Sequence, residues 1–271
     1  MLAAMALQRD RRTARATFDA VAALYDEARP GYPDAVYDDL VTLAGIGSGA
    51  RLLEIGSGTG HATLPLARRG FRIDCVEFGE QMAAVARTKL AGISGITITV
   101  ADFDRWIAGA GYDLAFSASA YHWLNPQTRV QRIAALIAPN GHVAIFRNHH
   151  VQGEASARFN AAAQRIYASV FPEQTQANGL SRTEEILPVE AQEWLASGLF
   201  SPAQTRVYRW QQLLTAQEYV RMVATHSDHR LLPEADRALL FEQFIRLIDS
   251  EFGGIVVKEY ITLLQVAEKI S

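Results

Sequence analysis

The chain has 271 residues, of which 49% are hydrophobic and 20% are charged, and its formal net charge is −3 at pH 7. This composition is typical of a globular protein, and the negative charge offers no broad basic surface to a nucleic-acid backbone. A single cysteine, Cys75, excludes an internal disulfide and a cysteine-rich zinc site. No apolar run reaches the ~18 residues of a membrane span, so we expect a cytoplasmic monomer or homodimer without a membrane partner. The charge balance disfavours a nucleic-acid partner.

Two helices are predicted before the first strand. Thr13 is typical of a helix N-cap, and the apolar residues that follow recur at helical spacing as far as Ala28. The prolines and the glycine of residues 29–33 predict a turn, and a second helix follows as far as Leu43. We therefore expect residues 1–45 to form a helical lid.

Strands and helices then alternate. Buried apolar runs predict five strands, at residues 51–55, 71–77, 96–102, 112–119 and 142–147. The segments between them have helical patterns, and residues 139–141 end the last of these helices. Such alternation is typical of a parallel, doubly wound sheet with right-handed crossovers. We expect residues 46–150 to form this core, with a kink where Pro65 interrupts the first crossover helix.

The pattern changes after Arg147. Residues 151–204 are mostly helical in pattern, with breaks at 171–172 and 177–179, and a sixth strand is predicted at 205–212. A second helical insert at 213–252 precedes a β-branched seventh strand at 255–267, so that residues 205–271 return the chain to the core. The predicted fold is an α/β, Rossmann-like doubly wound sheet of seven strands, mostly parallel with an antiparallel last strand. The inserts after strands 5 and 6 are expected to form a helical cap.

The sequence RLLEIGSGTGH (51–61) places Gly56, Gly58 and Gly60 at alternate positions behind the first strand. In open α/β sheets, ligands bind at the carboxyl ends of the strands where the winding direction reverses, which is beside this loop. A dinucleotide fingerprint has a glycine three residues beyond the second one, whereas this sequence has His61. Glu54 would repel a pyrophosphate, but its carboxylate can accept hydrogen bonds from an ammonium group. The loop therefore favours a positively charged nucleoside.

Two further acids end the next strands. Glu77 stands 21 residues after Gly56, a position from which a carboxylate can take both hydroxyls of a ribose. Asp102 ends the third strand, and Phe103 follows it where an adenine edge would lie. One acid after a strand is commonly a helix cap or a surface residue. Three of them at successive strand ends, beside one glycine loop, indicate a binding site.

Four motifs, LLEIGSGTG, VEFGEQM, ADFDRW and SASAYHWL, occur in this order along the chain. In order and spacing they resemble the class I S-adenosylmethionine-dependent methyltransferases, over roughly residues 15–150. RPGYP before the domain and AYHWL after its fourth strand further resemble the small-molecule branch, which includes trans-aconitate and malonyl-carrier-protein methyltransferases. The resemblance implies S-adenosyl-L-methionine as the cofactor and S-adenosyl-L-homocysteine as its product. No metal-binding constellation appears in the sequence, so we expect no metal.

The resemblance also implies roles in binding the donor. The loop glycines approach its methionyl part, Glu77 holds the ribose and Met82 packs on the adenine. Asp102 and Phe103 bind the adenine edge, and Ser117 lies near the amino-acid end. The residues expected to contact the donor are Glu54, Gly56, Ser57, Gly58, Gly60, Glu77, Phe78, Met82, Asp102, Phe103 and Ser117, with Tyr25 and Arg29 from the lid.

Histidines at the ligand edge of the sheet are the candidate bases. His122 follows the fourth strand between two aromatic residues, and we expect it to orient or deprotonate the acceptor. His149 and His150 follow the fifth strand. The residues expected to contact the acceptor are Tyr32, Tyr121, Trp123, Arg147, His149 and His226.

The predicted activity is methyl transfer to an oxygen, nitrogen or carbon atom of a small organic metabolite by in-line displacement. A protein that binds the donor without transferring the methyl group, using it as a fixed charge or retaining it as a vestige, would have the same motifs. An RNA methyltransferase fits the acidic composition poorly. A nicotinamide oxidoreductase would share the fold, but the last glycine of its fingerprint is missing.

Overall fold

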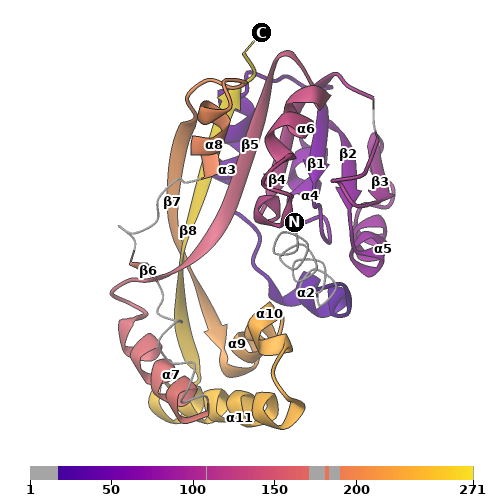
Figure 1. Cartoon of the computed structure of the whole chain (residues 1–271). Coiled ribbons are helices and arrows are strands. Elements are labelled where there is room, and N and C mark those ends of the chain that lie inside the picture. The colour runs from indigo at the N-terminus through magenta and orange to yellow at the C-terminus, as the bar shows by residue number, and fades with distance from the viewer. Residues whose placement is uncertain (1–17, 108, 171–180, 183–189, 271) are drawn as a thin grey trace.

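The computed structural model describes residues 18–107, 109–170, 181–182 and 190–270 (Figure 1). The predicted helix start at Thr13 and the predicted breaks at 171–172 and 177–179 lie outside these ranges. Within them, no helix has both the length and the apolar character needed to cross a membrane.

One mixed sheet runs through the molecule. Its main strands are β1 (Arg51–Ile55), β2 (Arg72–Glu77), β3 (Ile96–Val100), β4 (Tyr112–Ala118), β5 (Ile137–Gln152), β7 (Gln204–Thr215) and β8 (Ile255–Glu268). Their order is β3-β2-β1-β4-β5-β8-β7, and the short β6 (Ser181–Arg182) pairs with β5 off this path. Strands β1 to β5 pair in parallel, whereas β8 is antiparallel to both β5 and β7. The predicted seven-stranded, doubly wound fold with an antiparallel last strand is confirmed.

Helices cover both faces of the parallel part of the sheet. One layer contains α3 (Asp34–Leu43) and α4 (Thr63–Arg68), and the other contains α6 (Arg129–Leu136) and α8 (Glu190–Ala196). Because side chains alternate along a strand, successive residues of β1 pack against opposite helix layers. Leu52 packs in the first layer and Leu53 in the second. Beyond β3 lies α5 (Glu80–Lys89), and α2 (Ala22–Ala28) packs on α5.

The three strands that end the sheet order, β5, β8 and β7, are long, and further helices lie at their far ends. β5 has 16 residues, β7 has 12 and β8 has 14. Beyond them lie α7 (Ala157–Val170), α9 (Ala216–Val223), α10 (Ser227–Arg230) and α11 (Glu234–Glu251), which we call the cap (Figure 1). A third apolar core, in which Leu240, Phe244 and Ile248 of α11 pack with Tyr219 and Tyr260, joins the cap to the strands.

The fifth strand is longer than the sequence predicts. It was expected at 142–147 but runs over the whole of 137–152. Residues 139–141 do not end an element: they form an irregularity within β5, where the pairing with β4 shifts register and Asn140 has a φ of +61°. The extension beyond residue 147 brings three polar side chains, Asn148 to His150, onto the strand.

Pro65 does not kink the first crossover helix. α4 begins at Thr63, so Pro65 lies in its first turn, where a missing N–H removes no bond within the helix. The second insert also begins later than predicted, because β7 continues to Thr215. The Thr215 hydroxyl accepts the N–H of Glu218, whose side chain in turn accepts from Thr215, and this capping box starts α9.

Candidate active site

A cavity of about 490 Å³ lies at the carboxyl ends of the parallel strands. Small-molecule sites commonly have volumes of roughly 300–1,000 Å³. Its walls come from the glycine loop and the end of β2, from α2 and the segment after it, from the turn after β4, and from β5, β8 and the cap. The lining includes Phe18, Tyr25, Arg29, Tyr32, Gly56, Gly58, Glu77, Phe78, Met82, Phe103, His122, Trp123, Arg147, Asn148, His150, His226 and Tyr260.

The three loop glycines all have positive φ, +74° at Gly56, +57° at Gly58 and +82° at Gly60, a region that residues with a side chain rarely adopt. A Cβ on Gly56 would lie 2.5 Å from the Cβ of Ala120, so the loop touches the turn after β4 there. A Cβ on Gly58 would meet no atom within 4 Å, and Gly58 borders the cavity. Gly58 is therefore the point at which a ligand can approach the backbone most closely.

Glu77 ends β2 and lines the cavity, and its carboxylate is hydrogen-bonded to the glycine loop. One of its carboxylate oxygens accepts the N–H of Gly58 at 2.7 Å and the other accepts the N–H of Gly79 at 2.8 Å. These bonds hold the carboxylate at the cavity surface. A negative charge therefore faces the cavity at the place where the sequence predicts it.

Glu54 is buried under the loop and does not line the cavity. It points to the side of β1 occupied by α4, where it accepts a hydrogen bond of 2.6 Å from the Thr63 hydroxyl. The pKa of Glu54 is raised to about 8, chiefly by burial and also by the charge of Glu77. The hydrogen bond from Thr63 opposes this rise. The group is therefore mostly neutral at pH 7, and the structure does not place it where it could meet an ammonium group directly.

Some of the other residues expected to contact the donor line the cavity, and others do not. Phe78, Met82 and Phe103 line the cavity and provide apolar surface. The remaining ones, Ser57, Gly60, Asp102 and Ser117, are not among the lining residues. The Ser117 hydroxyl donates to the Ile55 carbonyl at 2.8 Å, so it braces β4 against β1.

The turn after β4 presents His122 and Trp123 to the cavity. It is a single 3₁₀ turn, Tyr121–Trp123, preceded by Ser119 at a φ of +55°. The ring of Phe18 contacts that of Trp123 edge-on, with centroids 5.9 Å apart. His122 thus lies beside the ring of Trp123 in the lining of the cavity, with ring centroids 4.7 Å apart.

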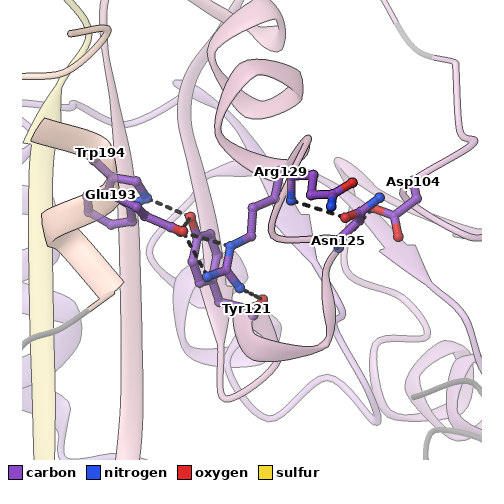
Figure 2. A network of polar contacts seen from close by, with 7 residues as sticks. Asp104, Tyr121, Asn125, Arg129, Glu193 and Trp194 are labelled. Carbon is purple, nitrogen blue, oxygen red and sulfur yellow. Dashed lines mark hydrogen bonds and ion pairs between the residues drawn. The ribbon is translucent and has the colours of Figure 1, made fainter. Parts of the chain in front are cut away.

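Tyr121 points away from the cavity into a polar network on the other side of the turn (Figure 2). Its hydroxyl donates to Glu193 and accepts the indole N–H of Trp194 at 2.8 Å. Arg129 pairs with Glu193 at 2.8 Å and donates to the Tyr121 carbonyl at 3.1 Å. The sequence expectation that Tyr121 contacts the acceptor does not fit this placement. Instead, Tyr121 fixes the turn that carries its neighbour, His122.

The extended part of β5 also separates two residues that the sequence places together. Side chains alternate along a strand, so Asn148 and His150 face the cavity whereas His149 faces a second pocket of about 20 Å³. Arg147 borders both. His149, which the sequence places at the acceptor, therefore lies outside the main cavity, whereas His150 lines it. Sequence reasoning missed Asn148 and Tyr260, because it ended the strand too early and did not pair β8 beside it.

Residues 52–141, which contain the glycine loop, Glu77 and the His122 turn, match the family model described as a methyltransferase domain. The sheet order, with its antiparallel last strand, agrees with this match. The chain contains a class I S-adenosylmethionine-dependent methyltransferase domain.

Curated relatives of this methyltransferase domain match over part of their length. An uncharacterized methyltransferase of Mycobacterium tuberculosis is 27% identical over 138 residues, 51% of this chain and 54% of the relative. A trans-aconitate 2-methyltransferase of the same species is 27% identical over 50% of this chain and 51% of its own. A malonyl-[acyl-carrier protein] O-methyltransferase of Bacillus cereus is 33% identical over 84 residues, 30% of this chain and 31% of its own. The chain thus spans about half or less of the relatives it matches.

Solved structures of similar fold cover more of the chain. The YcgJ protein of Bacillus subtilis has a TM-score of 0.55 at 13% identity and covers 88% of this chain and 100% of its own. A phosphoethanolamine N-methyltransferase 2 of Haemonchus contortus, solved with S-adenosyl-L-methionine, has a TM-score of 0.54 at 17% identity over 93% of this chain and 57% of its own. At such identities the likeness shows the fold of the methyltransferase domain alone.

The segment around α2 closes one side of the methyltransferase cavity. The Arg29 guanidinium donates to the Thr225 hydroxyl at 2.7 Å, and the Tyr32 hydroxyl donates to that of Ser119 at 2.8 Å. Asp26 of α2 accepts from Lys89 of α5 and lies 3.4 Å from the His61 ring. These contacts tie the described part of the predicted lid to the cap, to the turn after β4 and to α5.

The loop end of the cavity fits a nucleoside with a positive charge. Gly58 leaves its backbone open, and Glu77 is the one carboxylate among the described lining residues. Met82 and Phe103 offer apolar surface to a flat ring. In the described part of the chain, no group of three or more histidine, cysteine, aspartate or glutamate residues could hold a metal ion.

Proposed function

We propose that the protein transfers the methyl group of S-adenosylmethionine to an oxygen, nitrogen or carbon atom of a small organic molecule. The observation that carries the proposal is a single cavity whose described lining includes Gly58 and Glu77, His122, and polar residues of β5 and the cap. A methyltransferase has to hold donor and acceptor side by side in a fixed orientation, which can supply about 7–11 kcal/mol of the barrier reduction at best. A cavity with two chemically different ends suits that task.

The donor supplies an electrophilic methyl group when it is bound. At the loop end, Glu77 would accept the hydroxyls of its ribose, and Gly58 would allow close approach of its methionyl part. Phe78, Met82 and Phe103 would pack around its adenine. This assignment is supported by the fact that all five residues line the same cavity.

His122 is the residue best placed to act on the acceptor. It lines the cavity from the turn after β4, and the network around Tyr121 holds that turn in place. An acceptor that carries a proton needs a group to orient or remove it, and a histidine does so near neutral pH. The lid residues Tyr25, Arg29 and Tyr32 cover this region, which favours a small acceptor over an RNA strand.

A labelled-methyl experiment tests the proposal. The protein is incubated with methyl-labelled S-adenosylmethionine and a cell extract, and the label is followed into the small-molecule, RNA and protein fractions. We expect label in the small-molecule fraction, in compounds heavier by one CH₂. In a His122→Gln variant, turnover should fall by about 10²-fold or more with unchanged affinity for S-adenosylhomocysteine. His142→Gln, on the same sheet but outside the cavity, is the matched control and should keep full turnover.

Each other outcome contradicts a different part of the proposal. Label in RNA would assign a nucleic-acid substrate. Donor binding without any transfer would mean a donor-binding protein that performs no methylation. Full turnover in His122→Gln would leave the activity in place and remove His122 from the mechanism.

A further inference from the structure

One part of the cavity lining is built from basic residues. We call the group of Arg29, His150 and His226 the basic end; all three line the cavity. The rings of His150 and His226 lie 5.3 Å apart between centroids, and His150 lies 5.0 Å from the ring of Tyr260. They come from the segment after α2, from β5 and from the loop after α9, so the fold brings distant parts of the chain to one spot.

The basic end has hydrogen-bonding capacity that the described part of the chain leaves unused. Nδ1 of His150 and Nε2 of His226 are buried and have no hydrogen-bond partner there. Arg29 donates to the hydroxyl and to the carbonyl of Thr225, which occupies two of its five N–H groups. Buried polar atoms in proteins are normally paired, so these two ring nitrogens of cavity-lining residues are available to hydrogen-bond a ligand.

The charges around the two rings are positive. Burial lowers the pKa of His150 well below its usual range, and Lys258 and Arg29 lower it further. Burial also lowers the pKa of His226, with Arg29 and His150 as the next causes. Lys258 is itself buried, which lowers its pKa to about 8. Both rings are therefore neutral at pH 7, yet they stand in a positive field, and Glu77 is the one carboxylate among the described residues that line the cavity.

We propose that the basic end is the acceptor subsite and that it holds the acceptor through an oxyanion, a carboxylate or a phosphate. This inference rests on the proposed function. Arg29 would give a charge-assisted hydrogen bond, and each ring would direct an N–H at the anion. The recognised group can be the one methylated or can anchor the molecule while another atom reacts.

Binding of an anion there has a proton signature. The negative charge offsets the positive field that disfavours the protonated rings, so it raises the pKa of the histidines and favours proton uptake. Affinity for the anion should therefore rise as the pH falls toward the ordinary histidine pKa of about 6.5 and below it. The other charged or titratable groups that act on the two rings are Arg147 and His149 of β5, Lys258 of β8 and His229 of α10.

The test is calorimetric titration of the protein saturated with S-adenosylhomocysteine. The probes are matched pairs of small molecules: carboxylic acids with their primary amides, and phosphate monoesters with the parent alcohols. We expect members of one anionic series to bind at least about tenfold more tightly than their neutral partners. Titrations in buffers of different ionisation enthalpy should show proton uptake, and the preferred series tells a carboxylate site from a phosphate site.

Variants connect the preference to the residues. His150→Gln and His226→Gln should each reduce the preference for the anion about tenfold, with affinity for S-adenosylhomocysteine within about twofold of the wild-type value. His142→Gln, half-buried on β5 outside the cavity, is the matched control and should change neither quantity. Thermal unfolding of each variant shows that it is folded.

Equal binding of anionic and neutral partners would overturn the inference. So would a large loss of S-adenosylhomocysteine affinity in both variants with the anion preference intact, because the basic end would then hold the carboxylate of the donor itself. No binding of S-adenosylhomocysteine at all contradicts the proposed function, and the inference with it, and this result is distinct from the other two.

Discussion

Gly56 and Gly58 stand two residues apart in one loop, yet they lack a side chain for different reasons. At Gly56 the missing Cβ makes room for Ala120 of the turn after β4. At Gly58 it leaves an opening onto the cavity, and the amide there is already held by Glu77. The first glycine is thus a packing requirement, and the second, by our proposal, leaves room for the donor.

Alanine at three glycines should separate these reasons. Gly58→Ala and Gly92→Ala share a positive φ and an open surrounding, so each should cost about 1–2 kcal/mol of unfolding free energy from backbone strain. Gly56→Ala adds the clash with Ala120 and should cost about 2–5 kcal/mol. Chemical denaturation measures these costs. Calorimetry should show at least tenfold weaker S-adenosylhomocysteine binding for Gly58→Ala and no change for Gly92→Ala. Wild-type affinity in Gly58→Ala would contradict the proposal that the donor approaches the backbone at Gly58.

The acids show how far the sequence could predict individual residues. Spacing after the glycine loop placed Glu77 at the end of β2, and the structure puts its carboxylate at the cavity. Glu54 has equally suggestive spacing, but the alternation of side chains along β1 turns it toward α4. The same alternation separates His149 from His150. Which face a residue takes depends on where its strand begins and ends, and motif spacing alone does not contain this information.

Among the elements, α2 is held to the core by a small polar cluster. Asp26 has an exposed fraction of 22% and Lys89 one of 20%, so their ion pair is largely shielded from water. Burial and the neighbouring Lys89 lower the pKa of His61 to about 4, so the ring is neutral at pH 7 and Lys89 is the charged partner of Asp26. On α2's other side, Arg221 of α9 pairs with Glu27.

Breaking the Asp26 contact should loosen the packing of α2. Asp26→Asn keeps the shape of the side chain but removes the charge that Lys89 faces, which should cost about 1.5–3 kcal/mol of unfolding free energy. Because α2 and the residues after it line the cavity, affinity for S-adenosylhomocysteine should fall severalfold as well. Asp34→Asn is the control, since Asp34 is 88% exposed on α3 and should tolerate the change. Unchanged stability and affinity in Asp26→Asn would remove this anchor.

The elements of the parallel sheet could be predicted because each carries a local signal. Apolar runs bounded by glycines located β1 to β4, and the helix at 129–136 agrees with α6. β5 could not be bounded in this way, since its residues 148–150 are polar and only the pairing with β8 keeps them in the strand. Pairing between residues more than 100 positions apart leaves no local trace in the sequence.

In the whole molecule, the cavity is lined by residues that belong to, or pack against, all three apolar cores. Two of these cores flank the parallel sheet, and the third joins the cap to the long strands. Alternating strands and helices predicted the doubly wound sheet, and composition argued against a nucleic-acid surface. The basic end was not foreseen as a unit, because β5, the cap and the segment after α2 meet only in the folded chain.

The measurement that bears most directly on the central claim, a cavity built for a sulfonium nucleoside, is parallel calorimetric titration with S-adenosylmethionine, S-adenosylhomocysteine and NADH. Glu77→Gln is the test variant, and Glu80→Gln, an exposed acid three residues away, is its control. We expect both sulfur nucleosides to bind the wild-type protein and NADH not to bind, with affinity lost in Glu77→Gln by about tenfold or more and kept in Glu80→Gln. Binding of NADH alone would contradict the assignment of the glycine loop and, with it, the proposed activity.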